Sequence, residues 1–497
     1  MRDSWPTSAA SDQPDEPDGP DTAREPSPGS ASGVDLHLDL RLELPAGPGG
    51  GGRRAALERA LRDAVRSGRL APGARLPSTR RLAEEAGLAR GTVKAAYDQL
   101  TAEGYLTARQ GSGTVVADRP APRPAKPGVG PGTPRPRHDL RPGSPDVTAF
   151  PTSAWLRATR HALAAVPSAA YDYGDPRGRP ELRAALAEYL GRARGVLADP
   201  ERIVVTSGYV QGLALLVGVL GGGSRPVIAM EDPGLPFHRE VVRRNGGRVV
   251  PLPTDARGAR PDALPPGVAA AVVTPAHQYP TGVTLHPVRR RALTAWARAT
   301  GAVVVEDDYD GEFRYDRQPV GALQGTSPDH VVYLGTASKT LGPALRLGWM
   351  VLPPHLVGTV AEAKLYSDYH TGAVGQLALA DLIATHAYDR HVRACRLRYR
   401  RRRDLLLARL PPADGFHARG IAAGLHALVD LPADGPDEAA VLRRATAYSL
   451  ALGSLTDHWH SPAPDRPQGL IVGYGTPSEG GYPSALRALT RVLHGGP

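Results

Sequence analysis

The sequence predicts a chain of more than one domain: a small α+β domain near the N-terminus, then a large α/β domain with a mostly parallel sheet. At 497 residues the chain is longer than one hydrophobic core usually supports. Residues 53–117 hold twelve Arg or Lys and six Asp or Glu, a basic block of domain size. From about residue 140 onward, short apolar runs of strand length alternate with helical stretches, which is the pattern of parallel α/β sheets.

Composition excludes several classes of protein. The single cysteine, Cys395, rules out a disulfide framework within the chain and suits a reducing compartment. The acidic, Pro-rich N-terminus lacks the basic start and apolar core of a secretory signal. Apolar runs such as Leu213–Leu220 are too short to span a bilayer. We therefore expect a cytoplasmic protein without a membrane partner, whose net charge of +10 permits nucleic-acid binding.

The first 50 residues are acidic, with ten Asp or Glu against three Arg. Residues 1–33 contain few large apolar side chains and are predicted to form a disordered tail. Residues 34–44 alternate strictly between apolar and polar side chains, which predicts a strand with one buried face. We therefore place the start of the first domain, 34–117, at this strand, which a flexible break at 45–52 separates from the helices.

Three helices and a β-ribbon are predicted in the basic block. The helices cover 55–67, 78–87 and 90–102, and the ribbon covers 104–116. This order is that of a winged helix-turn-helix, in which the third helix enters the major groove of DNA and the ribbon reaches neighbouring phosphates or the minor groove. A small helical protein-interaction domain is the alternative, but the basic residues fall on the elements that should face DNA.

Several short motifs in this block carry a resemblance to a known family. They are Gly68-Arg69-Leu70, Leu76-Pro77-Ser78, Arg90-Gly91-Thr92-Val93, Glu103-Gly104-Tyr105-Leu106 and Gly111-Ser112-Gly113-Thr114. The block thereby resembles the N-terminal domain of GntR-type transcription regulators, which implies a double-stranded DNA operator as partner. The residues that this resemblance assigns to DNA contact are Arg80, Arg90, Thr92, Lys94 and, at the wing tip, Gln110 and Gly111. Arg90 and Lys94 lie one turn apart and share a helix face, so we expect one of them to read a base edge and Arg80 to bind phosphate.

The rest of the chain divides into a linker and the large domain. Residues 118–142 are rich in Pro and Arg, which predicts an extended, semi-rigid linker. The α/β domain is taken as 143–497, with a small C-terminal α+β subdomain at about 353–497. Strands are expected at 203–205, 226–230, 249–250, 269–273, 302–305, 331–334 and 348–352, and helices at 181–194, 210–218, 237–245, 289–299, 356–367, 373–386 and 388–410. Ligands of such sheets bind at the carboxyl ends of the strands.

The loop after the expected strand 331–334 holds one lysine, Lys339, among small hydroxyl residues, and Arg346 follows seven places later. A lysine amine in such a loop can form an imine with an aldehyde cofactor, while the hydroxyls and the arginine bind that cofactor's phosphate. Taken alone, the stretch favours an ordinary solvated lysine. The other strand ends decide between the two interpretations.

Two further strand ends carry groups that would serve such a cofactor. Thr206-Ser207-Gly208-Tyr209 opens a helix, where free N–H groups and the helix dipole attract phosphate. Asp307 follows an apolar strand, and a buried acid is costly unless it is used. Its carboxylate can keep a pyridine nitrogen protonated, so that the ring accepts electrons. The alternatives for Asp307 are a turn cap and a pair with Arg314.

Together with Glu231–Pro236 and Thr274–Gly282, these loops resemble a fold-type I aminotransferase domain that binds pyridoxal 5′-phosphate (PLP). Joined to a GntR-type winged helix, this is the architecture of MocR-type regulators, and the resemblance covers about residues 34–497. It implies a homodimer, with Lys339 as the residue that forms the Schiff base with PLP. It assigns the pyridine nitrogen to Asp307, the ring hydroxyl to Tyr309, the phosphate to Thr336, Ser338, Arg346, Ser207, Gly208 and Tyr209, and places Gln278 and Tyr279 near the ring. No metal site is assigned.

The sequence departs from the family pattern at two positions. Leu235 stands where the family usually has an aromatic residue stacked on the cofactor ring, and Val210 stands where it usually has Gln. Regulators of this type that bind an amino-acid effector hold its carboxylate with arginines. Arg466, in the C-terminal region, is the candidate here.

We therefore predict a transcriptional regulator that uses PLP as sensor or co-effector and controls vitamin B6 or amino-acid and amine metabolism, with an amino acid or amine as further effector. The alternative is a PLP-dependent aminotransferase that carries a DNA-binding module. A third hypothesis is a regulator with a degenerate cofactor site. Transamination is not expected to be the main role, and residual transaminase activity is compatible with the prediction.

Overall fold

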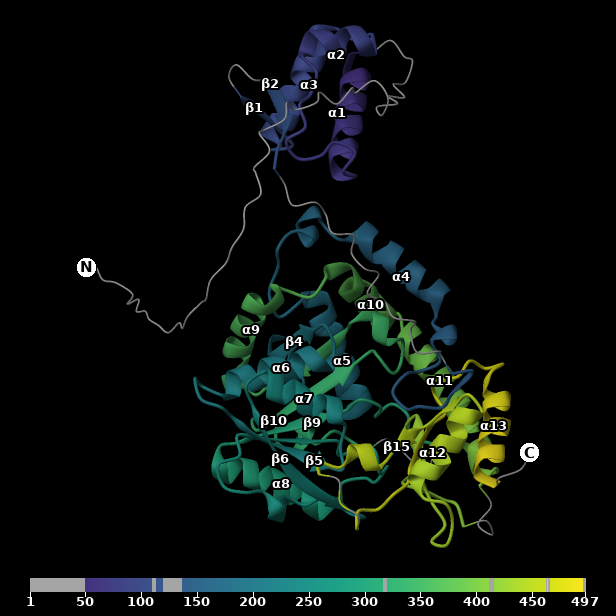
Figure 1. Ribbon diagram of the computed structural model, residues 1–497. Helices are drawn as coiled ribbons and strands as arrows, with labels where there is room; N and C mark the ends of the chain where they lie inside the picture. Colours follow the sequence, from purple (N-terminus) through teal and green to yellow (C-terminus); the bar gives the residue numbers. More distant parts are fainter. Residues whose placement is uncertain are drawn as a thin grey trace, which may run out of the picture. The chain divides into compact units, whose positions relative to one another are not determined.

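The computed structural model describes residues 50–109, 113–118, 136–315, 320–410, 415–461, 463 and 465–494. The chain separates into two compact units, residues 1–133 and 134–497 (Figure 1). The predicted tail 1–33, the predicted strand 34–44 and the wing-tip residues Gln110 and Gly111 lie outside the described residues.

The first unit consists of three helices and a two-stranded ribbon, as predicted. Its elements are α1 (Gly50–Arg66), α2 (Thr79–Ala86), α3 (Arg90–Ala102) and the antiparallel strands β1 (Leu106–Arg109) and β2 (Gly113–Val116). The Ser78 side chain accepts a hydrogen bond of 3.2 Å from the Arg81 N–H and caps α2, and Gly87 ends this helix with φ 61°. The helices and the ribbon share one core, which includes Leu57, Leu61, Leu82, Val93, Leu100, Leu106 and Val116.

The predicted linker 118–142 is shorter than expected at its C-terminal end. Strand β3 (His138–Asp139) pairs with β14 (Leu450–Ala451), and Leu140 is fully buried in the second unit. Three residues near the end of the Pro-rich stretch therefore belong to a folded core. Composition could not show this, because the pairing strand lies more than 300 residues away in the chain.

An eight-stranded sheet organises the second unit, in the order β4-β11-β10-β9-β8-β5-β6-β7. The neighbours from β10 to β6 are parallel, while β11 and β7 run antiparallel to their neighbours. The prediction of a mostly parallel sheet is confirmed. The strands are β4 (Ile203–Thr206), β5 (Val227–Asp232), β6 (Arg248–Asp255), β7 (Gly258–Ala259), β8 (Ala270–Val273), β9 (Val303–Asp307), β10 (Val331–Thr336) and β11 (Gly348–Val351).

Helices cover both faces of this sheet (Figure 1). Apolar side chains of the strands point alternately to opposite sides, so both faces have to be covered. On one face, side chains such as Val204 and Leu334 pack with α6 (Tyr209–Leu220), α7 (Pro236–Arg244) and α9 (Pro354–Asp368). On the other face, side chains such as Val205 and Tyr333 pack with α4 (Thr152–Ala165), α5 (Pro180–Arg194), α10 (Ala373–Ala384) and the start of α11 (Ala387–Leu407). Helix α8 (Pro287–Thr300) packs on the same face farther along, with Val304 and Val331.

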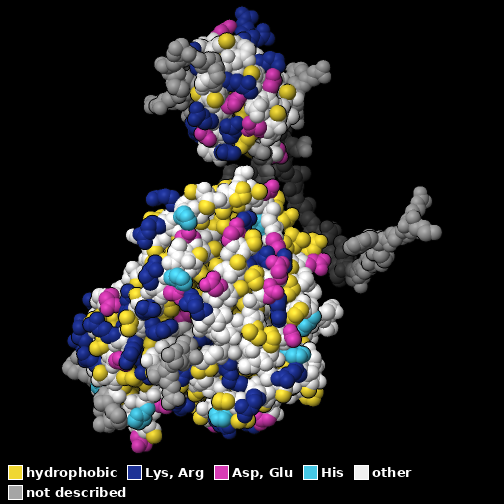
Figure 2. All heavy atoms as spheres, turned by 180° about the vertical axis from the view of Figure 1, so that it is seen from behind, with side chains coloured by type: hydrophobic (Ala, Val, Ile, Leu, Met, Phe, Trp, Pro, Cys, Tyr) yellow, Lys and Arg dark blue, Asp and Glu magenta, His cyan; other side chains and the backbone are white. Residues whose placement is uncertain are grey.

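A second core forms the small subdomain. Its sheet has the order β12-β13-β16-β15, with bounds His417–Arg419, His426–Asp430, Leu470–Gly473 and Gly453–Ser454, and it packs with α11, α12 (Glu438–Ala447) and α13 (Tyr482–His494). Helices α9 and α10 pack on the large sheet instead. Apart from Leu140 and Phe313, the second core therefore takes its residues from α11 onward, later than the expected start at 353. Arg and Lys side chains, shown in dark blue, are dense along the flank formed by α11–α13 (Figure 2).

Short 3-10 helices lie between these elements, at Val147–Ala149, Ser168–Tyr171, Pro200–Arg202, Pro261–Ala263, Gln324–Thr326, Pro343–Leu345 and Thr456–His458. In the part of the chain that the structure describes, none of the helices is long and apolar enough to cross a membrane.

A buried ion pair joins the site region to helix α5. Arg194, the last residue of α5, makes two hydrogen bonds with Asp308, of 2.7 and 2.9 Å, and both side chains are at most 2% exposed. The Tyr333 hydroxyl donates a further hydrogen bond of 2.7 Å to Asp308. The loop that follows β9 is therefore anchored by a carboxylate whose two oxygens both accept hydrogen bonds.

Replacing Arg194 with Met should lower the free energy of unfolding of the second unit by about 3–5 kcal/mol, because it leaves a buried carboxylate without its cation. Urea unfolding followed by circular dichroism measures this. The matched control is Arg192→Met in the same helix, whose pair with Asp389 (3.0 Å) is half exposed and should contribute about 1 kcal/mol or less. Equal losses in the two variants would contradict the assignment.

Candidate functional site

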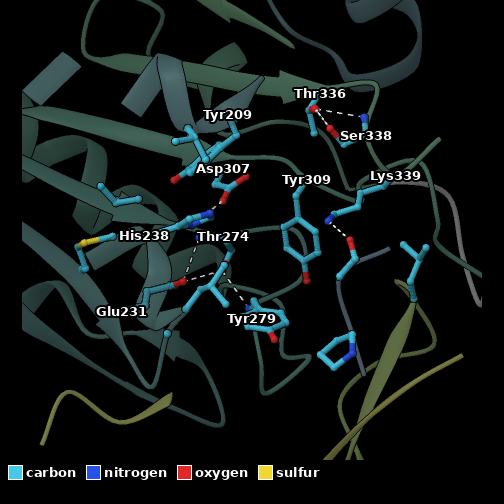
Figure 3. A pocket seen from close by; sticks show the side chains of 18 of the residues that line it. Tyr209, Glu231, His238, Thr274, Tyr279, Asp307, Tyr309, Thr336, Ser338 and Lys339 are labelled. Carbon is cyan, nitrogen blue, oxygen red and sulfur yellow. Dashed lines mark hydrogen bonds and ion pairs between the residues drawn. The ribbon is translucent and has the colours of Figure 1, made fainter. Parts of the chain in front are cut away.

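A cavity of about 270 Å³ lies at the carboxyl ends of the central strands (Figure 3). Of the residues assigned to the cofactor from the sequence, the structure brings eight to its wall: Tyr209, Tyr279, Asp307, Tyr309, Thr336, Ser338, Lys339 and Arg346. The wall also contains residues that sequence reasoning did not assign, among them Gly143, Glu231, His238, Thr274, Leu425 and His426. The sheet register explains the meeting of distant segments, since Asp307 pairs with Leu334, five residues before Lys339.

Lys339 follows β10, and its ammonium group donates a hydrogen bond to the main-chain oxygen of Gly143. Burial lowers the pKa of this amine, while the charges of Asp307 and Asp310 oppose the shift. A lowered pKa increases the fraction of neutral amine, which is the nucleophilic form. The predicted role in imine formation therefore fits the surroundings of this lysine.

Asp307 is the last residue of β9, and its side chain is buried. Its Oδ1 atom has no hydrogen-bond partner among the described residues, and its Oδ2 atom lies 4.0 Å from Nδ1 of His238. Burial raises the pKa of the carboxyl well above its usual value, and the nearby Lys339 charge opposes this. A buried carboxylate with a free oxygen at the cavity wall suits a protonated pyridine nitrogen.

His238 and Tyr209 lie beside this carboxylate. Their rings are stacked, with centroids 4.4 Å apart and an angle of 27° between the planes (Figure 3). Burial lowers the pKa of His238 to about 3, so this imidazole stays neutral at physiological pH. The Tyr209 hydroxyl is buried and interacts with Asp307, but it makes no hydrogen bond of normal length with a described residue. The Asp307 side of the cavity thus contains two polar groups that are not fully satisfied by each other, which fits a polar ligand.

The other end of the cavity contains the residues assigned to phosphate. Thr336 and Ser338 hydroxyls lie 2.8 Å apart, and the Ser338 N–H donates to the Thr336 hydroxyl at 3.1 Å. A side chain at Gly208 would meet the Arg346 guanidinium at 3.3 Å, so this arginine lies directly over the start of α6. Donors from β10, from the segment before β11 and from a helix N-terminus converge here, as a phosphate group requires.

Three assigned residues are not part of the cavity wall. The Ser207 N–H donates to Oε1 of Gln211 at 2.7 Å, and Gly208 contributes only its backbone, at φ 102°. Gln278 is buried, donates to the main-chain oxygens of Pro233 and Tyr279, and accepts hydrogen bonds from Thr281. The amide of Gln278 therefore stabilises its own loop, next to Tyr279 at the cavity wall, and its place near the ring stays a prediction.

Arg239 and Arg466 are engaged with other groups. Arg239 donates to the main-chain oxygens of Gly234, His458 and Trp459 at 2.8 to 3.1 Å. Arg466 lies 4.6 Å above the Trp459 ring and 3.4 Å from the Asp232 carboxylate, outside the cavity wall. The arginine named from the sequence for an effector carboxylate is thus held elsewhere.

In the first unit, the assigned DNA contacts Arg80, Arg90 and Lys94 lie on exposed surface, and Thr92 is half-buried. The side chains of Arg80 and Lys94 are 80% and 69% exposed and pair only with Glu84 and Asp98 one turn away on their own helices. Arg90 is exposed at the first position of α3. Exposed pairs of this kind are weak and exchange readily for phosphate.

Comparisons with known proteins match both units. A family model described as bacterial regulatory proteins of the gntR family matches residues 53–116, and one described as aminotransferase class I and II matches residues 143–457. The HTH-type pyridoxine biosynthesis transcriptional regulator PdxR of Corynebacterium glutamicum is 36% identical over 423 residues, which cover 84% of this chain and 91% of that protein. The probable rhizopine catabolism regulatory protein MocR of Rhizobium meliloti is 34% identical, covering 83% of this chain and 88% of that protein.

Solved structures similar to the second unit are aminotransferases. The kynurenine aminotransferase of Pyrococcus horikoshii has a TM-score of 0.64 and 26% identity, covering 71% of this chain and 90% of its own. An aspartate aminotransferase mutant of Thermus thermophilus has a TM-score of 0.63 and 27% identity, covering 72% of this chain and 96% of its own. With both units matched in this order, the chain belongs to the MocR-type regulators of the GntR family, DNA-binding transcriptional regulators with an aminotransferase-like domain.

Proposed function

We propose that this regulator binds PLP through Lys339 and uses the bound cofactor as its sensor. The observation that carries the proposal is the pairing, in one cavity, of an amine with a lowered pKa and a buried carboxylate oxygen without a partner. Both are expensive to keep in a protein interior unless a ligand engages them. When bound, PLP supplies an aldehyde that condenses with an amine, with loss of water, and a ring that accepts electrons.

Each part of the cavity has one task in this proposal. Lys339 provides the amine, and Asp307 accepts a hydrogen bond from the pyridine nitrogen. Tyr309 holds the ring hydroxyl, and Tyr279 lies beside it, fixed by a contact of 3.1 Å between its hydroxyl and Nε2 of His458. The phosphate is held by Thr336, Ser338, Arg346 and the backbone of Gly208 and Tyr209, while the Ser207 N–H is engaged with Gln211.

We also propose that two copies of the chain act together. Tyr173 and Tyr366 are 75% and 82% exposed, and the Tyr173 ring lies 4.5 Å from that of Tyr369, itself 46% exposed. Exposed aromatic side chains of this size favour burial against another surface. A homodimer would present two winged helices, which predicts paired half-sites in the operator.

Control of vitamin B6 metabolism is the regulatory role that we favour. The support is the relative in Corynebacterium glutamicum, whose name states pyridoxine biosynthesis. In this proposal PLP itself is the signal, in the cytoplasm, and an amino acid or amine that exchanges with Lys339 is a second effector. A change in the second unit would then alter the spacing of the DNA-binding domains through the linker.

The second candidate function is a PLP-dependent aminotransferase that carries a DNA-binding module. The similarity to solved aminotransferases favours it. Steady turnover of an amino acid with a keto acid, unaffected by deletion of residues 1–117, would establish it. The engagement of Arg239 and Arg466 with other groups argues against efficient binding of an amino-acid carboxylate.

Purified protein mixed with PLP should show the visible absorbance band of a Schiff base, and Lys339→Ala should lose it. The chain has four lysines, Lys94, Lys126, Lys339 and Lys364, so borohydride reduction and peptide mass spectrometry identify the attached residue without ambiguity. Lys364 is a built-in control, since it is fully buried and paired with Asp368 at 2.7 Å. Absence of the band, or attachment elsewhere, would refute the sensor proposal.

Arg90→Ala combined with Lys94→Ala should weaken specific DNA binding by about 30-fold or more, because two contacts of about 1–3 kcal/mol each are lost. The measurement is titration of a duplex that the wild-type protein selects from a random pool. The control, Arg54→Ala with Arg59→Ala in α1, removes the same charge from exposed positions. Both double variants should keep the Schiff-base band, and equal weakening by both would mean that the recognition helix is misplaced.

Gly348→Ala should weaken PLP binding about 10-fold, or about 1.4 kcal/mol. Its Cβ would lie 2.8 Å from the Cα of Gly208, so the backbone that holds the phosphate would have to shift. The control is Gly342→Ala in the segment after Lys339, where a Cβ meets no atom within 4 Å. Titration of the absorbance band with PLP compares the two, and equal affinities would contradict the proposed phosphate site.

A further inference from the structure

A buried carboxylate and imidazole lie behind Tyr309, on the side away from the open cavity. Nδ1 of His277 is 2.8 Å from Oδ2 of Asp310, and both side chains are at most 3% exposed. The same Nδ1 lies 3.1 Å from the Tyr309 hydroxyl, which donates to the main-chain oxygen of His277 at 3.2 Å. Two atoms of one residue therefore hold the phenol oxygen.

The hydrogen-bond pattern assigns the proton of this imidazole. An ionised carboxylate only accepts hydrogen bonds, so Nδ1 of His277 must carry the hydrogen that faces Asp310. The Tyr309 oxygen then accepts from the same N–H, and its own hydrogen points to the main-chain oxygen. This arrangement gives Tyr309 one orientation, with its ring on the cavity wall near Lys339 (Figure 3).

The small subdomain encloses the pair. A Cβ at Gly424 would lie 2.3 Å from Cε1 of His277 and 2.6 Å from Oδ2 of Asp310, so the backbone packs directly on both side chains. On another side, the rings of His277 and His426 are 5.1 Å apart. The imidazole has no room to turn, and its contact with Tyr309 persists only while this packing is intact.

We propose that the His277–Asp310 pair positions Tyr309 and so sets the protonation state of the Schiff base at Lys339. The inference rests on the proposed function, because it concerns the bond that Lys339 forms there. His277 and Asp310 are positioning residues, since they act through Tyr309.

The charge of Asp310 determines in which direction each variant should shift the midpoint of the Schiff-base titration. It favours the protonated form of a nearby nitrogen, and it raises the pKa of the Tyr309 phenol in addition to the effect of burial. The N–H of His277 offsets part of this charge. Removing His277 therefore leaves the negative charge of Asp310 less compensated, which favours the protonated Schiff base. Removing the Asp310 charge has the opposite effect. The other titratable or charged groups of the cavity wall around the Schiff-base position are unchanged in both variants: Asp307, Tyr209, Glu231, His238, Arg239, Tyr279, Arg346 and His426.

The test is a pH titration of the visible absorbance of the PLP-loaded, full-length protein. For His277→Ala we expect the midpoint of the colour change to rise by about 1 pH unit, and for Asp310→Asn to fall by a similar amount. His277→Asn places an amide N–H close to the position of Nδ1 and should restore at least half of the shift. The control is His161→Asn, which breaks a His–Asp pair of 2.5 Å on the exposed surface, at Asp381, and should leave the midpoint unchanged.

The outcomes separate the two proposals. If the wild-type protein shows no band, the proposed function fails. If the band is present but the two variants shift the midpoint in the same direction, or not at all, the positioning role is overturned while the Schiff base stands. If His277→Ala does not fold, as judged by circular dichroism, His277→Gln takes its place, since it keeps the volume but moves the amide N–H away from Nδ1.

Discussion

The region around the cavity depends on how the carboxylates at the end of β9 and in the loop after it are paired with other groups. Residues 306–312 place five carboxylates within seven positions at the carboxyl ends of buried strands, where an unpaired charge is costly. Glu306 accepts hydrogen bonds from the main-chain N–H groups of Leu323 and Gln324 at 2.7 and 2.9 Å. Asp308 pairs with the guanidinium of Arg194, and Asp310 pairs with the imidazole of His277. Among these three aspartates, Asp307 is the one with a fully buried oxygen that has no partner in the described part of the chain, and Asp307 lines the same cavity as Lys339.

The order of the helices and strands could be predicted from the sequence. Contacts between side chains of distant segments could not. Periodicity and capping residues placed the helices of the first unit and the strands of the sheet, because those signals are local. His238 could not be assigned in this way. It is one polar residue at the start of an amphipathic helix, and only the sheet register brings it within 4.0 Å of Asp307. His277 is a comparable case, since its role depends on an acid 33 residues later in the chain.

The same distinction applies to Gln278 and to the end of the linker. Gln278 sits in a loop rich in polar residues next to a strand end, which suggests a ligand contact. In the structure its amide satisfies the backbone of a tight turn, which is the commoner use of a buried amide. The end of the linker was misplaced because Pro and Arg dominate its composition, while a two-residue strand and one buried leucine, Leu140, anchor it.

A regulator does not have to hold a substrate for turnover at this cavity, as an enzyme does. The departures from the aminotransferase pattern agree with that difference. Turnover requires a substrate to be held beside the lysine in a reactive geometry, usually through its carboxylate. Here Arg239, although it lines the cavity, donates to three main-chain oxygens, and Arg466 binds a ring and Asp232, so both guanidinium groups are already engaged. Leu235 lines the wall where a stacking ring would hold the cofactor more tightly. In the proposed function, looser binding makes occupancy of the cavity depend on the concentration of PLP, and a sensor requires that dependence.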